Sequence, residues 1–238
     1  NEALAKQLVQ TVICNFRAQD VLLGGQGAPL VPIGDLLLFP DYNACLNLGG
    51  FANCSMSKSG DVIAYDICAV NTVMNSLAEK KGMPFDTAGK LAKNGTLIPE
   101  LFSDLSSLEF YKITSPKSLG IEWVNSIISP LLTKFNDHKV ENILHTYARH
   151  VSLEISKNFS KNQHILVTGG GAKNLFLMSL LKTDCLATLF LPEEKLIDFK
   201  EALIFGFLGV LRVRNEVNCL ATVTGASEDH SSGNIFYS

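Results

Sequence analysis

The sequence predicts an α/β protein built on a mixed β-sheet. Short apolar stretches at 44–48, 52–56 and 62–65 lie close together around glycine turns, as antiparallel strands do. Helical periodicity fills the middle of the chain, and strand and helix patterns then alternate between residues 164 and 212. Antiparallel strands followed by alternating strand and helix units are typical of an α/β domain whose single sheet carries both strand directions.

Composition limits the classes of function. The 238 residues are 47% hydrophobic, which is enough for a large core, and 20 basic against 23 acidic residues leave a net charge of −3 with no long run of one sign. That pattern gives no electrostatic footprint for nucleic acid. The apolar stretch 202–211 is about half a membrane span and is closed by Glu201 and Arg212. We expect a cytoplasmic protein with small-molecule partners, and the composition leaves a homodimer open.

Cysteine and histidine spacing predicts no metal site. The six cysteines show no CxxC pattern and lie mostly in apolar segments, as small core residues of a reduced cytosolic protein do. We therefore expect neither disulfides nor zinc. The five histidines form no HExxH motif, and His145 and His150 are five apart, not on one helical face.

The first elements lead into a glycine loop. Residues 2–9 have helical spacing, and 11–14 predict a short buried strand. In the segment 24–32, three glycines let a ligand approach the main chain, whereas Pro29 and Pro32 fix φ and withhold a donor. The segment is either a shaped binding edge or an ordinary turn.

The remaining elements follow from periodicity and punctuation. The three strands around residues 44–65 meet a helix at about 69–81, with Gly82 in the C-terminal stop position. Pro116 and Pro130 punctuate the middle of the chain. The further predicted elements are helices at 87–93, 99–105, 121–135 and 140–159, a strand at 164–167, a helix at 174–182, a strand at 187–191 and a helix at 199–212.

Asp66 is the candidate general base. It follows an apolar strand and precedes a predicted helix, which would place its carboxylate at the carboxyl edge of the sheet, where ligands of α/β folds collect. A general base belongs there. An aspartate before a helix is equally an ordinary N-cap, so both interpretations stay open.

The triple glycine 169–171 is the candidate phosphate site. It follows the buried strand 165–167 and opens a helix, so that free N–H groups converge on one point that attracts phosphate. A tight connection without a ligand is the alternative. The segment matches neither GxxxxGK[ST] nor GxGxxG, which disfavours a Walker-type NTPase and a Rossmann dehydrogenase.

A third candidate segment surrounds the single tryptophan. Lys117, Ser118 and Glu122 offer a cation, a hydroxyl and a carboxylate at the start of a predicted helix. Ser118 and Glu122 are equally explained as a helix cap and a first-turn acid.

Taken in order, these motifs resemble those of the anhydro-N-acetylmuramic acid kinase family, and the resemblance spans almost the whole chain. The GGQGAPLVP and NLGGxAN strings are specific, whereas GGGxxN is shared across actin-like sugar kinases. The matching segments are 20–32, 47–55, Tyr65-Asp66, 116–123, 167–174, 198–203 and 223–236.

The resemblance implies an actin/hexokinase/Hsp70-like (ribonuclease H-like) fold with a mixed sheet flanked by helices, and with ATP and sugar in a cleft between two domains. It also implies the reaction. The family cleaves the 1,6-anhydro bond of anhydro-N-acetylmuramic acid with water and phosphorylates O6 from ATP with Mg²⁺, giving N-acetylmuramic acid 6-phosphate in cell-wall recycling.

The resemblance further implies roles for individual residues. Asp66 would take a proton from the water that attacks C1, and we expect it to share one hollow with the triple glycine. The residues implied to line the cleft near the sugar are Gly25, Gln26, Asn47, Gly49 and Gly50. Those implied to face the nucleotide are Gly169, Gly170, Gly171, Asn174, Lys117 and Gly120.

The chain departs from the family pattern in several places. The SGTS turn and the HGQT stretch are absent, TGPGN reads ICAVN at 67–71, and Asn15, Asn75 and Ile121 replace two aspartates and an arginine. We therefore expect 1–14 to be a remnant of the N-terminal domain, 15–213 the C-terminal kinase domain and 214–238 a tail returning toward the former. The activity of this chain is expected to be impaired or absent. A non-catalytic nucleotide- or sugar-binding module and a kinase for another small molecule are the alternatives.

Overall fold

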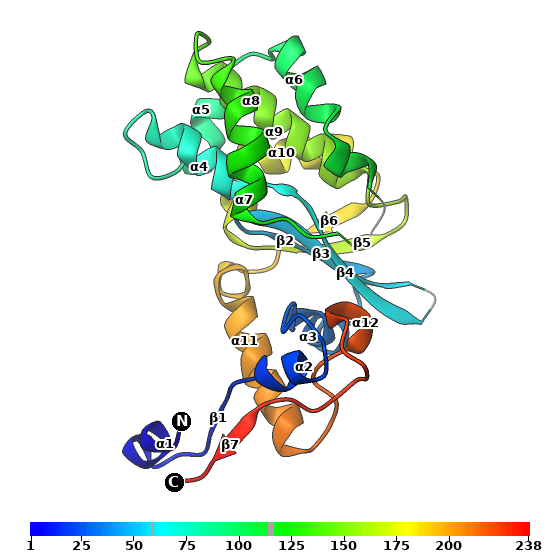
Figure 1. The fold of residues 1–238 in the computed structure, drawn as a ribbon. Helices are drawn as coiled ribbons and strands as arrows, with labels where there is room; N and C mark the ends of the chain where they lie inside the picture. Colours follow the sequence, from blue (N-terminus) through cyan, green and yellow to red (C-terminus); the bar gives the residue numbers. More distant parts are fainter. Residues whose placement is uncertain (59, 114–116) are drawn as a thin grey trace. The chain divides into compact units, whose positions relative to one another are not determined.

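The computed structural model describes residues 1–58, 60–113 and 117–238, so the predicted break at Pro116 lies outside the described residues (Figure 1). The chain divides into two compact units. The first unit contains residues 1–41, 55–64 and 199–238, and the second contains 42–54 and 65–198. The domain boundaries predicted at residues 14 and 213 divide the chain between the two domains of the kinase family. These boundaries stay a prediction.

A five-stranded sheet has the order β4-β3-β2-β5-β6. Strand β2 (Ala44–Leu48) pairs in parallel with β5 (His164–Thr168), and β5 pairs in parallel with β6 (Thr188–Phe190). Two residues separate β2 from β3 (Phe51–Lys58), and two separate β3 from β4 (Asp61–Ala69). Neighbouring strands joined so tightly are antiparallel, since a parallel connection needs a dozen residues or more. The mixed sheet of the predicted actin-like fold class is confirmed.

Helix α9 (Val140–Ser156) is the centre of the second unit. It packs against α4 (Asn71–Glu79), α5 (Lys90–Lys93), α6 (Pro99–Ser106) and α10 (Leu175–Asp184). Its fully buried apolar side chains recur at spacings of three and four, as in an amphipathic helix. The Tyr147 hydroxyl donates to the carbonyl of Ala69 over 2.9 Å, which fixes α9 to the end of β4. Figure 1 shows α4, α5, α6, α9 and α10 of this unit gathered on the same side of the sheet.

The predicted helix 121–135 is interrupted. It consists of α7 (Ile121–Trp123), a π-helical stretch at Val124–Ile128 and α8 (Ser129–Thr133). Pro130 is the second residue of α8, directly after the π-helical stretch, where it cannot donate a helical hydrogen bond. The shorter 3₁₀ segments of this unit are η1 (Thr87–Gly89), η2 (Glu109–Lys112) and η4 (Gly170–Lys173).

The first unit packs around α11 (Glu194–Val213), whose residues from Phe199 onward belong to it. Its apolar cluster joins α3 (Val31–Leu38) to α11 through Ile33, Ile204 and Leu208. The other elements are α1 (Glu2–Leu8), α2 (Ala18–Leu22) and α12 (Ala221–Thr224), and β1 (Val12–Cys14), which pairs antiparallel with β7 (Asn234–Phe236).

Several predicted boundaries were wrong for identifiable reasons. Pro32 was expected to stiffen a loop, but it occupies the first turn of α3, the helical position that tolerates proline. The last long helix begins at Glu194, earlier than expected, because a charged and polar first turn hides its periodicity. No helix within the described ranges is both long and apolar enough to cross a membrane.

His150 on α9 makes the stability of the fold sensitive to acid. Burial, with a smaller effect from Lys157, lowers the pKa of this fully buried histidine to about 3. Its Nδ1 lies 3.9 Å from Glu154 Oε1, but Glu154 is already paired with Lys157 at 2.7 Å.

We expect the free energy of unfolding to fall as the pH drops below about 6.5, the pKa of an unfolded histidine. Between that pH and the folded pKa, only the unfolded chain binds the proton, so His150 should cost about 2 kcal/mol by pH 5. Urea unfolding at pH 7 and pH 5 measures this loss. His150→Gln should remove it, whereas His138→Gln, at an exposed position, should keep it; equal pH dependence in both variants would contradict the assignment.

Candidate functional site

The structure brings two of the predicted glycine turns, 49–50 and 169–171, together where β2 and β5 end. Asn47 and Thr168 are paired in the parallel register of the two strands, so their following turns start side by side. A Cβ atom on Gly169 would lie 2.5 Å from Asn47 Oδ1, and one on Gly49 would lie 3.2 Å from Asn47 Nδ2. The Asn47 amide therefore lies against both turns.

The three glycines at 169–171 differ in what a side chain would meet at each position. Gly169 has φ +84° and ψ 163°, a conformation essentially restricted to glycine, and its Cβ would lie 2.8 Å from the backbone of Leu48. A Cβ on Gly171 would meet the Leu48 side chain at 2.8 Å. At Gly170 the nearest atom is Asn71 Nδ2 at 3.8 Å, an ordinary contact. Packing explains Gly169 and Gly171, and only Gly170 presents open main chain to a ligand.

The start of α4 completes this cluster, and sequence reasoning missed its part in it. Asn71 donates through Nδ2 to the Leu48 carbonyl over 3.1 Å, and its backbone N–H donates to Gly49. Thr72 N donates to the Gly50 carbonyl over 3.2 Å, and a Cβ on Gly50 would lie 2.6 Å from Thr72 Oγ1. The available signal was the asparagine that ends the ICAVN string, because it matches the last residue of the TGPGN motif.

Asn174 is placed as a helix cap. Its side chain accepts from Leu177 N over 3.0 Å at the start of α10, which satisfies an otherwise free helical donor. The neighbouring Lys173 pairs with Glu194 at 3.1 Å and with Asp198 at 2.7 Å. These contacts account for both residues structurally, and the predicted contact of Asn174 with nucleotide stays a prediction.

Asp66 lies inside β4, three residues before its end, so its predicted position at the carboxyl edge was wrong. At about 3.3 Å per residue, Ala69 is about 10 Å further along the strand. The strand continues because Ile67, Cys68 and Ala69 are fully or almost fully buried apolar residues.

The carboxylate of Asp66 is held from outside the strand. Leu119 N donates to Oδ2 over 2.7 Å, and Asp66 N donates to the Lys117 carbonyl over 2.9 Å, so residues 117–119 run along this edge of the sheet. Burial raises the pKa of Asp66, and the hydrogen bond from Leu119 partly opposes the shift. The hydrogen bond from Leu119 N goes to Oδ2, and no described residue donates a hydrogen bond to Asp66 Oδ1.

Lys117 is directed toward aromatic side chains. Its Nζ lies 4.4 Å from the ring centroid of Phe110 and donates to the Phe110 carbonyl over 3.2 Å. Desolvation lowers the pKa of Lys117, and the charge of Glu154 opposes the shift. Gly120 precedes α7 in an extended conformation, where a Cβ would collide with the Glu122 carboxylate. The described contacts do not join Lys117 or Gly120 to the glycine turns.

Gly25 and Gln26 belong to the first unit, where the glycine loop is fixed from within. Gly25 N donates to the Asp20 carbonyl over 2.8 Å, and Gly27 N donates to Asp20 Oδ2 over 2.7 Å. Gln26 N donates to the Thr224 carbonyl over 3.0 Å. A Cβ on Gly25 would collide with the Asp20 carboxylate, so this glycine is required by packing.

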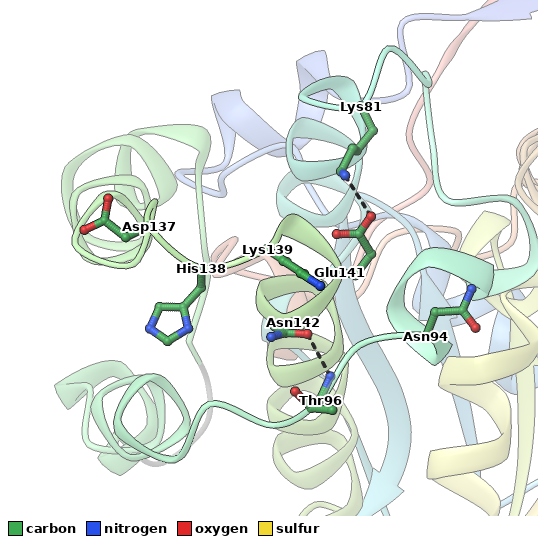
Figure 2. A pocket seen from close by; sticks show the side chains of 8 residues that line it. All are labelled: Lys81, Asn94, Thr96, Asp137, His138, Lys139, Glu141 and Asn142. Carbon is green, nitrogen blue, oxygen red and sulfur yellow. Dashed lines mark hydrogen bonds and ion pairs between the residues drawn. The ribbon is translucent and has the colours of Figure 1, made fainter.

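A polar cavity of about 790 Å³ lies elsewhere in the second unit, at the start of α9 (Figure 2). Lys81 points to Glu141 across 2.8 Å and lowers the pKa of that carboxyl, and Thr96 N donates to Asn142 Oδ1 over 3.0 Å. These groups satisfy one another, so their geometry does not call for a ligand. The lining residues are Lys81, Asn94, Thr96, Asp137, His138, Lys139, Glu141 and Asn142, none of them a predicted site residue.

Comparison with protein families agrees with the motifs. The family model described as "Anhydro-N-acetylmuramic acid kinase" matches residues 1–238. The chain belongs to this family. An anhydro-N-acetylmuramic acid kinase of Bacillus cereus is 30% identical, with 98% of this chain and 67% of the relative covered. That of Actinobacillus pleuropneumoniae serotype 5b is 36% identical, with 95% and 65% covered. The chain spans about two thirds of the length of these kinases.

Solved structures give weaker similarity. The activator of the 2-hydroxyisocaproyl-CoA dehydratase from Clostridium difficile with bound ADPNP aligns with a TM-score of 0.46 and 15% identity, covering 76% of this chain and 65% of that one. Component A of the Acidaminococcus fermentans (R)-2-hydroxyglutaryl-CoA dehydratase aligns with a TM-score of 0.44 and 16% identity, covering 73% and 63%. The kinase family assignment rests on sequence, and the fold class on the order and directions of the strands.

Proposed function

We propose that the chain is the part of an anhydro-N-acetylmuramic acid kinase that supplies the catalytic base and one side of the nucleotide site. The observation that carries the proposal is Asp66, a half-buried carboxylate with one oxygen fixed by a backbone N–H. A catalytic base needs this combination of fixed orientation and a free oxygen. Family membership then selects the substrate, the 1,6-anhydro sugar.

In the proposed reaction, Asp66 Oδ1 accepts a proton from the water that attacks C1 of the sugar. The C1–O6 bond breaks as the water oxygen bonds to C1, and the released O6 takes the γ-phosphoryl group of ATP. Burial raises the pKa of Asp66 and so makes its carboxylate a better proton acceptor than an exposed aspartate. The N–H of Leu119 keeps the carboxylate oriented.

The ends of β2 and β5 suit the phosphate side of the nucleotide. Gly170 has open main chain, and the amides of Asn47 and Asn71 are adjacent. Main-chain N–H groups and side-chain amides are neutral donors that can hold phosphate oxygens in a fixed geometry. Mg²⁺ bound with ATP supplies charge neutralisation during phosphoryl transfer.

The described residues give this chain a base and neutral phosphate donors, while the relatives are about half as long again. We therefore expect the 238-residue chain alone to release ADP only slowly from ATP in the presence of anhydro-N-acetylmuramic acid. Coupled measurement of ADP, with a curated relative of full length as the reference, tests this expectation. Turnover equal to the reference would show that the 238 residues alone suffice for catalysis.

A non-catalytic nucleotide- or sugar-binding module is the second candidate. It is favoured by the ICAVN segment at 67–71, which replaces the glycine-rich TGPGN motif with bulkier residues. Calorimetry separates the two, because a module binds sugar or nucleotide but gives no ATP-dependent product. A panel of sugars and carboxylates as acceptors tests whether the kinase acts on another small molecule. We assign the reaction to the cytoplasm, and light scattering of the purified protein tests the homodimer.

A further inference from the structure

We propose that Asp20, Cys219 and His230 form a binding site for a transition-metal ion, with Zn²⁺ as the first candidate. Their ligand atoms lie within 4.8 Å of one another, and all three residues are buried in the first unit. Carboxylate, thiolate and imidazole are the ligand types that zinc takes in proteins. The sequence predicted no metal because Asp20 lies on α2 and the other two lie about 200 residues later.

The orientation of His230 carries the proposal. Its Nδ1 lies 3.0 Å from the Glu228 carbonyl, which can only accept, so Nδ1 bears the hydrogen and a neutral ring has its lone pair on Nε2. Nε2 is buried without a hydrogen-bond partner among the described residues and lies 3.6 Å from Asp20 Oδ1. Two acceptors therefore face each other, and a bound cation satisfies both.

The contact of Nδ1, the other ring nitrogen of His230, is also typical of a metal-binding histidine. Metal-binding histidines almost always donate their other N–H to a carbonyl, a carboxylate or water, which fixes the tautomer. The Glu228 carbonyl has this role for His230.

The distances suit a small tetrahedral ion. Cys219 Sγ lies 3.1 Å from Asp20 Oδ1, and His230 Nε2 lies 3.6 Å from the same oxygen. Ligands at about 2.0 to 2.3 Å from zinc are about 3.3 to 3.8 Å apart in a tetrahedron, so shifts of a few tenths of an ångström suffice. On binding, the metal–sulfur bond replaces the Cys219 S–H bond, and the proton leaves to solvent.

Hydrogen bonds hold the three ligands in place before any ion binds. Cys219 and His230 form an antiparallel bridge with N–H donors to each other's carbonyls, both at 3.1 Å. Asp20 Oδ1 also accepts from Thr224 Oγ1 over 2.6 Å, and its Oδ2 accepts from Gly27 N. A metal here would stabilise the 24–27 loop, whose Gly25 and Gln26 are predicted to face the sugar.

Cobalt titration of the metal-free protein tests the site, because Co²⁺ replaces Zn²⁺ and its bond to a thiolate gives a near-ultraviolet charge-transfer band. We expect a single Co²⁺ per chain with this band, displaced by Zn²⁺. Cys219→Ser should lose the band, and Cys14→Ser, a matched change at a partly buried cysteine of the same unit, should keep it. A band that survives Cys219→Ser would overturn the proposal.

Thermal unfolding gives a readout that does not depend on the fold of the cysteine variant. Zn²⁺ should raise the Tm of the unsubstituted protein and of Cys14→Ser, and raise that of His230→Gln much less, because a ligand that binds only the folded state stabilises it by mass action. If the unsubstituted protein binds neither ion, the proposal fails.

Discussion

We expect Asp66→Asn, made in a protein of the full length of the related kinases, to lower kcat by about 10²- to 10⁴-fold. Nucleotide affinity should stay unchanged. The amide keeps the size and the hydrogen bond from Leu119 N, which is 2.7 Å in length, but it cannot accept a proton from water. Steady-state measurement of ADP release, with calorimetry of nucleotide binding, separates lost chemistry from lost binding.

Asp61→Asn is the matched control, since Asp61 is an exposed aspartate at the start of the same strand. It should leave kcat unchanged. The pH profile gives a second check. Because burial raises the pKa of Asp66, kcat/KM should fall with acid at a pH above the ordinary aspartate value of about 4. Full turnover in Asp66→Asn would rule out the assigned base.

The sequence was a good guide where a local pattern decides the structure. The Gly49-Gly50 turn between apolar stretches and the buried repeat of α9 are local patterns, and both elements formed as expected. Asp66 shows the limit. Its predicted place at a strand end assumed that Tyr65 closed the strand, but the apolar residues after it extend β4 to Ala69. A single run of apolar residues does not reveal where a strand stops and a helix starts.

The candidate sites depend on contacts between distant segments, which no local pattern contains. Gly169, Gly170 and Gly171 look equivalent in the sequence, and only the packing against Leu48 distinguishes them. The Asp20 and His230 side chains meet across almost the whole length of the chain. Spacing rules find metal ligands that lie on one helix or one turn, and they miss ligands that the tertiary fold brings together.

Gly169→Ala should lower the free energy of unfolding by about 3 kcal/mol or more. The substitution forces an alanine into a backbone conformation that only glycine adopts readily, and its Cβ would lie 2.8 Å from the Leu48 carbonyl group. Urea or thermal unfolding of the two proteins measures the loss. An unchanged unfolding midpoint would mean that the backbone bend relaxes easily around a side chain. Packing would then not be the reason for glycine at position 169.

Gly170→Ala is the paired variant, and it separates packing from ligand binding at adjacent positions. Because the new methyl group would meet only Asn71 Nδ2 at 3.8 Å, stability should change by no more than about 0.5 kcal/mol. A methyl group on the open main chain should nevertheless obstruct phosphate, and we expect nucleotide affinity to fall at least tenfold, about 1.4 kcal/mol. If Gly170→Ala binds nucleotide normally, the bend is a tight strand-to-helix connection that does not contact phosphate, and the nucleotide must be held elsewhere.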